Sequence, residues 1–248
     1  MLQQTQVDRV IPKWHAWLER FPTLTALAAA SRADAIRAWQ GLGYNLRAVR
    51  LHAIAQQAVA EFGGQLPSDL HQLQRLAGVG RYTAGAIACF AFEQRVAIVE
   101  TNIRRVLARV FGASENVQNL AEAALPGAEV AYAWNQALMD LGATLCRPRQ
   151  PLCLVCPLLT ECAQAQQMPE VASARPRQPT PPFESTERYV RGRILDALRA
   201  VPSGEALSFD LLARLVPTRT LTHLMRSSCR LAAEGLVTLE DDGLRLPT

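Results

Sequence analysis

Four cysteines lie close together in the second half of this chain, and their spacing constrains the fold more than any other feature. They are Cys146, Cys153, Cys156 and Cys162, in the pattern C-x6-C-x2-C-x5-C. Because the first residues do not resemble a secretory leader, this spacing favours a metal or iron-sulfur site over a disulfide framework. Tetrahedral zinc and a [4Fe-4S] cube both accept four thiolates, so the spacing leaves both open, with a purely structural clip as the simplest role.

The cysteine loop is also basic, because Arg147 and Arg149 lie inside it. A loop that carries cations can contact phosphates as well as pin the fold, which favours a nucleic-acid partner. The net charge of +4 and the pI of about 8.9 agree in sign, but any basic surface must be local. We therefore treat both arginines as candidate DNA-binding residues.

Composition limits the class of protein and its chemistry. With 248 residues, 49% of them hydrophobic, the chain can bury one sizeable core and add a small second domain. It contains no apolar run of roughly 18 residues and no basic segment before an apolar stretch, so we expect a cytoplasmic, nucleoid-associated protein without a membrane partner. Lys13 is the only lysine, which argues against a Schiff-base mechanism, since that chemistry needs a primary amine.

Helical periodicity dominates the first two thirds of the chain. Apolar residues recur at intervals of three and four, for example over 7–17 and 54–62. Alternating β patterns are nearly absent from this part. We therefore predict an all-α domain over residues 1–165.

The last third differs in composition. Residues 166–186 are rich in proline, which predicts a semi-rigid linker. Helical patterns follow over 187–200, 208–215 and 219–234. A β-hairpin is predicted over 236–246, with Asp242 and Gly243 at its turn. Three helices and a two-stranded wing predict a winged-helix-like domain over 187–248, a class that binds DNA in some proteins and only other proteins in others.

A glycine-bearing turn lies between two helical stretches, at Leu76-Ala77-Gly78-Val79-Gly80-Arg81-Tyr82-Thr83-Ala84. The glycines let the backbone turn with its amides outward, and the next helix points its N-terminus at the same place, which suits phosphate. Two glycines alone are a weak signal, because helix hairpins also use glycine simply to turn. The whole segment resembles a helix-hairpin-helix motif, and its candidate DNA contacts are Gly78, Val79, Gly80, Arg81 and Thr83.

Glu100, in Ile98-Val99-Glu100-Thr101-Asn102, is predicted at the start of a helix. The positive end of the helix dipole keeps a carboxylate ionised there. Such a carboxylate could stabilise an oxocarbenium ion as a glycosidic bond breaks. The simpler interpretation is a glutamate that only favours the dipole.

Together these motifs resemble a known family. Met1-Leu2-Gln3-Gln4-Thr5-Gln6-Val7, Gly41-Leu42-Gly43-Tyr44, Met139-Asp140-Leu141-Gly142, the hairpin and the cysteine loop are similar to those of the MutY adenine DNA glycosylases. These enzymes belong to the helix-hairpin-helix, iron-sulfur superfamily that also holds endonuclease III. The resemblance covers residues 1–165. It implies a two-lobed α domain, a [4Fe-4S] cluster on the four cysteines, and removal of adenine mispaired with guanine or 8-oxoguanine by a monomer on double-stranded DNA.

The resemblance also assigns residues by position. Gln4, with Gln3 beside it, matches a side chain that wedges into the base stack when the target nucleotide is extruded. The positions around the base opposite the target are matched by Thr5, Leu42 and Tyr44.

Two further matches concern the chemistry. Tyr82 occupies the hairpin position where relatives with strand-cleaving activity carry lysine, and Asn102 matches an asparagine near the catalytic carboxylate. The resemblance and the single lysine both predict a monofunctional glycosylase that leaves an abasic site.

The chain departs from the family pattern in three places. Glu100 stands where most members have aspartate, and one methylene moves a carboxylate by about an ångström, which can cost roughly a hundredfold in rate. The family's general acid is a glutamate two residues before the Met-Leu-Gln-Gln run, so we expect translation to begin upstream of Met1. The family's C-terminal domain, which resembles a nucleotide hydrolase, is replaced by the winged-helix-like segment, whose partner is unknown.

Other functions stay open at this point. A thymine or uracil mismatch glycosylase of the same superfamily is one, and a lesion-binding protein that has lost catalysis is another. A zinc-stapled regulator is a third, and the colour of the purified protein would separate it from an iron-sulfur protein.

Overall fold

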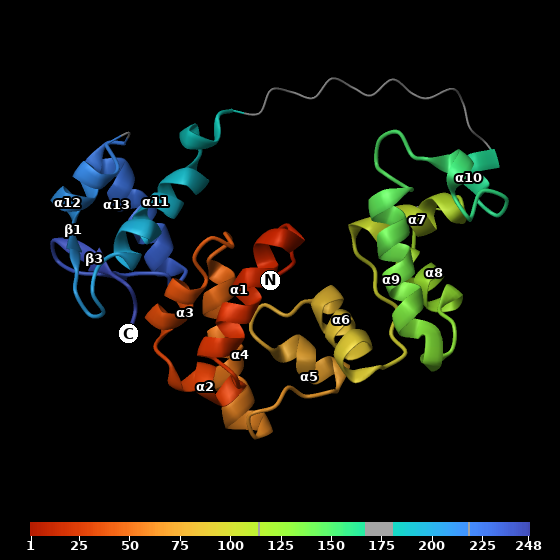
Figure 1. Ribbon diagram of the computed structural model, residues 1–248, viewed down its shortest axis with the longest axis horizontal. Coiled ribbons are helices and arrows are strands. Elements are labelled where there is room, and N and C mark those ends of the chain that lie inside the picture. The colour runs from red at the N-terminus through yellow and green to blue at the C-terminus, as the bar shows by residue number, and fades with distance from the viewer. Residues whose placement is uncertain (114, 167–180, 218) are drawn as a thin grey trace. The chain divides into compact units, whose positions relative to one another are not determined.

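A computed structural model describes residues 1–113, 115–166, 181–217 and 219–248 (Figure 1). Most of the predicted linker, 167–180, lies outside the described residues. The chain divides into two compact units, one of Met1–Leu66 with Pro179–Thr248 and the other of Pro67–Gln178. Both are mainly helical, which confirms the predicted fold class of a helical protein with a small C-terminal α/β domain. Within the described ranges, no helix is long and apolar enough to cross a bilayer.

The first unit begins with four helices. They are α1 Val7–Arg20, α2 Leu24–Ala29, α3 Arg32–Ala38 and α4 Leu46–Phe62. Thr23 and Ser31 cap α2 and α3 by accepting hydrogen bonds from backbone amides three residues further on, as short polar side chains at helix starts do. Helix α4 ends at Gly63, whose φ of 64° is a conformation that glycine adopts at little cost.

The C-terminal part of the first unit contains three helices and a small sheet. Its elements are the 3-10 turn Phe183–Ser185, α11 Glu187–Arg199, β1 Leu207–Ser208, α12 Phe209–Leu215, α13 Leu221–Ala233, β2 Thr238–Leu239 and β3 Gly243–Arg245. The sheet is antiparallel in the order β1-β3-β2. The predicted hairpin is therefore present, with Asp242 at its turn. Gly243 closes the turn by accepting from the amide of Glu240 over 2.9 Å, and it lies in β3 opposite Ser208. A Cβ at Gly243 would collide with the backbone of Leu207, so glycine is needed for strand pairing.

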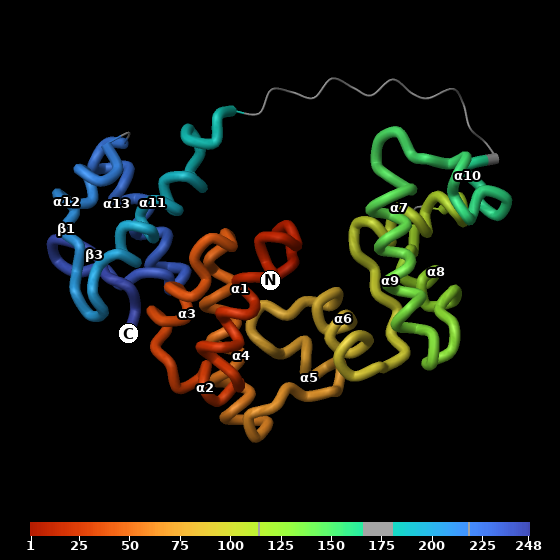
Figure 2. Tube along the Cα trace, viewed as in Figure 1, coloured from red at the N-terminus to blue at the C-terminus, as the bar shows by residue number. Residues whose placement is uncertain are grey.

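The beginning and the end of the chain share one hydrophobic core. Trp39 and Ile36 of α3 and its C-terminal flank belong to the same buried cluster as Ile194 and Leu198 of α11. The chain end runs beside α3, where the amide of Ala33 donates to the carbonyl of Pro247 over 3.0 Å (Figure 2). The C-terminal domain is therefore packed onto the first helices through apolar surface and backbone hydrogen bonds.

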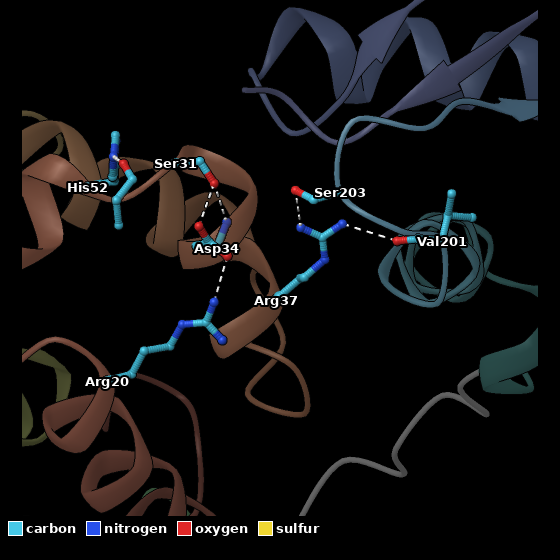
Figure 3. A network of polar contacts seen from close by, with 8 residues as sticks. Arg20, Ser31, Asp34, Arg37, His52, Val201 and Ser203 are labelled. Carbon is cyan, nitrogen blue, oxygen red and sulfur yellow. Dashed lines mark hydrogen bonds and ion pairs between the residues drawn. The ribbon is translucent and has the colours of Figure 1, made fainter.

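Arginines add polar links across this shared core. Arg37 of α3 donates to the carbonyl oxygen of Val201 over 3.1 Å and to the hydroxyl of Ser203 over 3.3 Å (Figure 3). On the other side of α3, Asp34 accepts from Arg20 over 2.6 Å and from the Ser31 hydroxyl over 2.7 Å. Helix α3 is thus held on one side by α1 and on the other by the segment that follows α11.

The second unit contains the remaining helices. They are α5 Leu70–Arg75, α6 Arg81–Phe92, α7 Thr101–Val110, α8 Val117–Ala124, α9 Ala128–Thr144, the 3-10 turn Cys153–Val155 and α10 Ala163–Gln166. Its core gathers Ile98, Ile103, Val106 and Leu138 with the buried thiol of Cys89. Helix α7 packs along α9, so the start of α7 and the cysteine loop after α9 belong to one rigid arrangement.

Candidate functional site

The predicted hairpin is present between α5 and α6. Gly78 has a φ of 75°, and the amide of Val79 donates to the carbonyl of Leu76 over 3.1 Å, which closes the turn. Gly80 caps α6 without a side chain, and a Cβ there would meet no atom within 4 Å. The turn therefore presents open backbone at a helix N-terminus, the arrangement that suits a phosphate oxygen.

The side chains around this turn differ in exposure. Val79 is buried, so any contact of this residue with DNA comes from its backbone. Arg81 is exposed and donates to Glu122 over 3.3 Å, a surface ion pair that a phosphate can replace at little cost. Thr83 lies half-buried in the first turn of α6.

Glu100 is the N-cap residue of α7, as its sequence position predicted. Its Oε1 atom accepts a hydrogen bond from the backbone amide of Ile103 over 2.8 Å. This bond fixes the carboxylate at the positive end of the helix. A negative group so held can stabilise positive charge that develops nearby on a bound sugar.

The pKa of Tyr82 depends on its burial and on the charge of Glu100. Burial, and then the negative charge of Glu100, raise the pKa of the Tyr82 phenol above its usual 10.0. The group is therefore protonated and neutral at physiological pH. It offers no amine for a covalent intermediate.

Arg105 joins the start of α7 to the end of α9. Its guanidinium donates to Asn102 Oδ1 over 2.7 Å, to the carbonyl of Gly142 over 2.6 Å and to the carbonyl of Cys146 over 2.7 Å. A Cβ at Gly142 would lie 2.6 Å from the Cβ of Asn102, so glycine allows the two helices to approach. Asn102, predicted near the catalytic carboxylate, is thus fixed against the segment that leads into the cysteine loop.

The four cysteines of the loop are free and half-buried. Burial raises the pKa of the Cys153 thiol, and the charges of Cys162, Cys146 and Cys156 raise it further. Arg109 donates to Cys146 Sγ over 3.4 Å, and its carbonyl accepts from Cys162 Sγ over 3.5 Å. The donor set fits a thiolate-ligated group, and a nearby guanidinium offsets the negative charge of such ligands.

The geometry of the cysteine ligands and the exposure of the two arginines also characterise this loop. In the part of the chain that the structure describes, no group of three or more His, Cys, Asp or Glu side chains is arranged around a single metal ion. Arg147 and Arg149 are exposed, and Arg147 donates to the carbonyl of Thr144 over 2.9 Å, where α9 ends. Both cations therefore stay available at the surface of the cysteine loop.

The predicted wedge and base-reading residues lie together in the other unit. Arg47, which the sequence reasoning did not select, holds them. It donates to the carbonyl of Gln3 over 2.8 Å, to Thr5 Oγ1 over 3.2 Å and to the carbonyl of Leu42 over 3.3 Å. Further bonds reach the carbonyls of Met1 and Gly43. One guanidinium thus ties residues 1–5 to the Gly41–Tyr44 loop.

The backbone of these two segments is strained. Gln4 and Tyr44 have φ values of 58° and 47°, a left-handed conformation that costs roughly 1–2 kcal/mol for a residue with a side chain. Gln4 and Tyr44 are exposed, whereas the Leu42 side chain is only 3% exposed and lies in the core. A contact of Leu42 with DNA would therefore come from its backbone.

Three arginines were missed from sequence: Arg47, Arg105 and Arg109. Each sits in a helix whose periodicity shows only that the position is not fully apolar. The four-residue spacing of Arg105 and Arg109 places them on one face of α7, and that spacing was the one available signal. Each also donates to at least one backbone carbonyl more than thirty residues away in the sequence, Gln3 for Arg47, Cys146 for Arg105 and Arg147 for Arg109, and no sequence pattern reveals those acceptors.

Comparisons with known proteins identify the family of this chain. A family model described as HhH-GPD superfamily base excision DNA repair protein matches residues 1–126. An adenine DNA glycosylase of Mycolicibacterium smegmatis is 44% identical over 205 residues, covering 80% of this chain and 69% of the relative. One of Mycobacterium tuberculosis is 41% identical over 251 residues, covering 98% of this chain and 81% of the relative.

The human adenine DNA glycosylase and two solved structures are also similar to this chain. The human adenine DNA glycosylase is 43% identical over 182 residues, which are 68% of this chain and 32% of that protein. A solved thermostable thymine-DNA glycosylase has a TM-score of 0.63 and 28% identity over 67% of this chain and 81% of its own. An endonuclease III bound to DNA has a TM-score of 0.58 at 22% identity, over 66% of this chain and 79% of its own, a likeness of fold.

The family model covers more than half of the chain, and the mycobacterial relatives align with most of it. The chain therefore belongs to the HhH-GPD superfamily of base excision DNA repair proteins, in the branch of the adenine DNA glycosylases.

Proposed function

We propose that this protein is a monofunctional DNA glycosylase of base-excision repair, which hydrolyses the N-glycosidic bond of adenine mispaired with guanine or 8-oxoguanine. The observation that carries the proposal is the carboxylate of Glu100, fixed as the N-cap of α7 by the amide of Ile103. The substrate base follows from relatives named adenine DNA glycosylase at 41–44% identity. The thymine-DNA glycosylase is less similar, at 28% identity.

The reaction begins with extrusion of the target nucleotide. Gln4 enters the space left in the base stack, which offsets the lost stacking, while the backbone amides of the hairpin bind phosphate. As the bond to adenine breaks, positive charge develops on the deoxyribose. The carboxylate of Glu100 stabilises this charge, and water completes the hydrolysis.

The residues near Glu100 determine what happens to the product. Because Tyr82 carries a protonated hydroxyl, the sugar carbon is not captured by an amine and the DNA strand stays intact. Asn102, fixed by Arg105, lies two residues after Glu100 and keeps the start of α7 in place. The product is an abasic site.

We assign a [4Fe-4S] cluster to Cys146, Cys153, Cys156 and Cys162. Its contribution when bound is to pin the loop that carries Arg147 and Arg149, so that both arginines can contact DNA phosphates. Iron and acid-labile sulfide analysis of the purified protein tests this assignment apart from activity. Four iron atoms per chain support it, whereas stoichiometric zinc in a colourless protein contradicts it.

The experiment that tests the function uses labelled duplexes containing A·G, A·8-oxoguanine, T·G or U·G pairs. The purified protein is expected to produce alkali-dependent breaks at adenine and no breaks before alkali treatment. Glu100→Gln keeps the shape and the capping oxygen but removes the charge, so it should abolish cleavage while DNA binding persists. Glu129→Gln, in the first turn of α9, is the matched control and should cleave normally. Cleavage at thymine or uracil alone would place the protein with the mismatch glycosylases of that specificity.

A further inference from the structure

An arginine of the C-terminal domain lies on the loop that the sequence resemblance assigns to the base opposite the target. Arg188 is in the first turn of α11, and its guanidinium carbon is 4.6 Å from the centroid of the Tyr44 ring. Its Nη2 atom would lie 3.5 Å from a Cβ at Gly43. Both residues belong to the same compact unit, so this proximity is part of its internal packing.

Both sides of this contact are held in place. The loop is fixed by Arg47, which donates to the carbonyl of Gly43 over 3.3 Å. The far end of α11 is fixed by Arg199, which donates to the carbonyl of Ile36 over 3.1 Å and to Asn45 Oδ1 over 2.8 Å. Because Asn45 directly follows Tyr44, these two adjacent residues contact α11 near both of its ends.

Among the residues that the structure describes, Arg188 differs from its neighbours in having no charge partner. Arg191, one turn along α11, forms a two-bonded pair with Glu234 at 2.8 and 2.5 Å, and Arg199 pairs with Asp196 at 2.9 Å. Over the described ranges, no acceptor binds the exposed Arg188 guanidinium, and its contact is the Tyr44 ring. A guanidinium stacked on an aromatic ring still has N–H groups at its edge, which match a pair of oxygen or nitrogen acceptors.

We propose that Arg188 donates two N–H groups to a paired acceptor on the DNA strand opposite the target base, so that the C-terminal domain forms part of the DNA-reading surface. This rests on the proposed function, because the strand is defined by the role given to Tyr44. The paired acceptor is either two phosphate oxygens or the O6 and N7 atoms of guanine. Arg188 is thus a DNA contact supplied from outside the region 1–126 that the family model matches.

The test compares Arg188→Gln with Arg193→Gln. Arg193 is also exposed on α11, no acceptor within the described residues binds its side chain, and it lies about 140° around the helix from Arg188. Equilibrium binding is measured on A·G and A·8-oxoguanine duplexes in which a 2′-fluoro group on the target nucleoside prevents cleavage. The salt concentration is varied, and thermal unfolding of each variant checks the fold.

Arg188→Gln is expected to weaken binding about tenfold, and Arg193→Gln to leave it within about twofold. A phosphate contact predicts loss on all duplexes and a salt slope smaller by about one. A base contact predicts loss only with guanine opposite, which 7-deazaguanine in the wild-type complex reproduces. Equal behaviour of the two variants overturns the proposal. Wild-type protein that binds but does not cleave adenine overturns the proposed function and leaves the Arg188 result standing, whereas wild-type protein that binds no duplex overturns both.

Discussion

The carboxylate of Glu100 accepts a hydrogen bond from the backbone amide of Ile103 at 2.8 Å, so the proposed catalytic group is also the cap of its own helix. The capping hydrogen bond orients the carboxylate. The length of the side chain determines how far the carboxylate extends toward the sugar. Glutamate extends one methylene further than the aspartate that most MutY proteins carry at this position. The distance between the carboxylate and the sugar is therefore a property that substitution can change without loss of the helix.

Glu100→Asp tests this reach. Aspartate caps helices as well as glutamate does or better, so stability should be unchanged. If the longer side chain misplaces the carboxylate by about an ångström, the substitution raises the single-turnover rate of adenine release by up to roughly a hundredfold. A rate that falls would instead show that this active site is built around glutamate. Glu100→Gln, measured in parallel, should be inactive in either case.

Arg199 should be essential for joining the two ends of the chain. Its side chain is only 6% exposed and satisfies the carbonyl of Ile36 and the side chain of Asn45. Arg199→Met fills a similar volume but leaves those acceptors unpaired, which should lower the free energy of unfolding by about 2–3 kcal/mol in urea titrations. Arg193→Met on the same helix is the control and should change it by less than about 0.5 kcal/mol. Equal effects of the two would mean that the Arg199 bonds add nothing.

Local features of this molecule were predictable from sequence, whereas long-range partners were not. The glycines of the 76–80 turn, the helix start at Glu100 and the β-hairpin after α13 all depend on a few adjacent residues, and the structure contains each of them. Periodicity shows which face of α3 or α11 is apolar, but it does not identify the helix against which that face packs.

Gly243 and Arg47 show why long-range partners could not be predicted from the sequence. Gly243 was expected at a turn because of its neighbours in the sequence. Its need for glycine comes from β1, a strand more than thirty residues earlier in the chain, whose backbone pairs closely with it. Arg47 looks like an ordinary helical arginine, and its importance comes from the carbonyls of Met1 and Gln3, which the fold brings to it. In both cases the determining neighbour is distant in sequence and is defined only after folding.

Acid should weaken the packing of α11 on α13. A hydrogen bond from Arg191 is the main cause that holds the pKa of Glu234 below its usual 4.5. A carboxyl with a lowered folded-state pKa contributes stability that is fully present above 4.5 and is lost as pH falls through the folded-state value. In urea titrations between about pH 2 and 7, Glu234→Gln should be less stable than wild type at neutral pH and should approach it in acid. A difference that does not change with pH would contradict this account.

Glu187 should act in the same direction. Burial alone would raise its pKa, but hydrogen bonds from Ser227 and His223 outweigh that effect and lower it. Ser227→Ala should therefore raise the pKa of Glu187 and move the onset of acid destabilisation to higher pH. Carboxyl titration followed by NMR measures this change directly, and an unchanged Glu187 pKa would show that the Ser227 bond is not important.

Substitution of two helical glycines by alanine should change the stability of the protein in opposite directions. A Cβ at Gly142 would lie 2.6 Å from the Cβ of Asn102 and 3.1 Å from its carbonyl oxygen, so Gly142→Ala must push α9 away from α7. Overpacking of this kind costs about 1–3 kcal/mol, and it should also slow base release because Asn102 and Arg105 shift with it.

A Cβ at Gly192, in the middle of α11, would meet no atom within 4 Å. Gly192→Ala should therefore stabilise the protein by about 0.5–1 kcal/mol, because alanine loses less backbone freedom in a helix. If both substitutions destabilised the protein equally, the loss at Gly142 would reflect a general intolerance of helical alanine rather than the contact between α7 and α9.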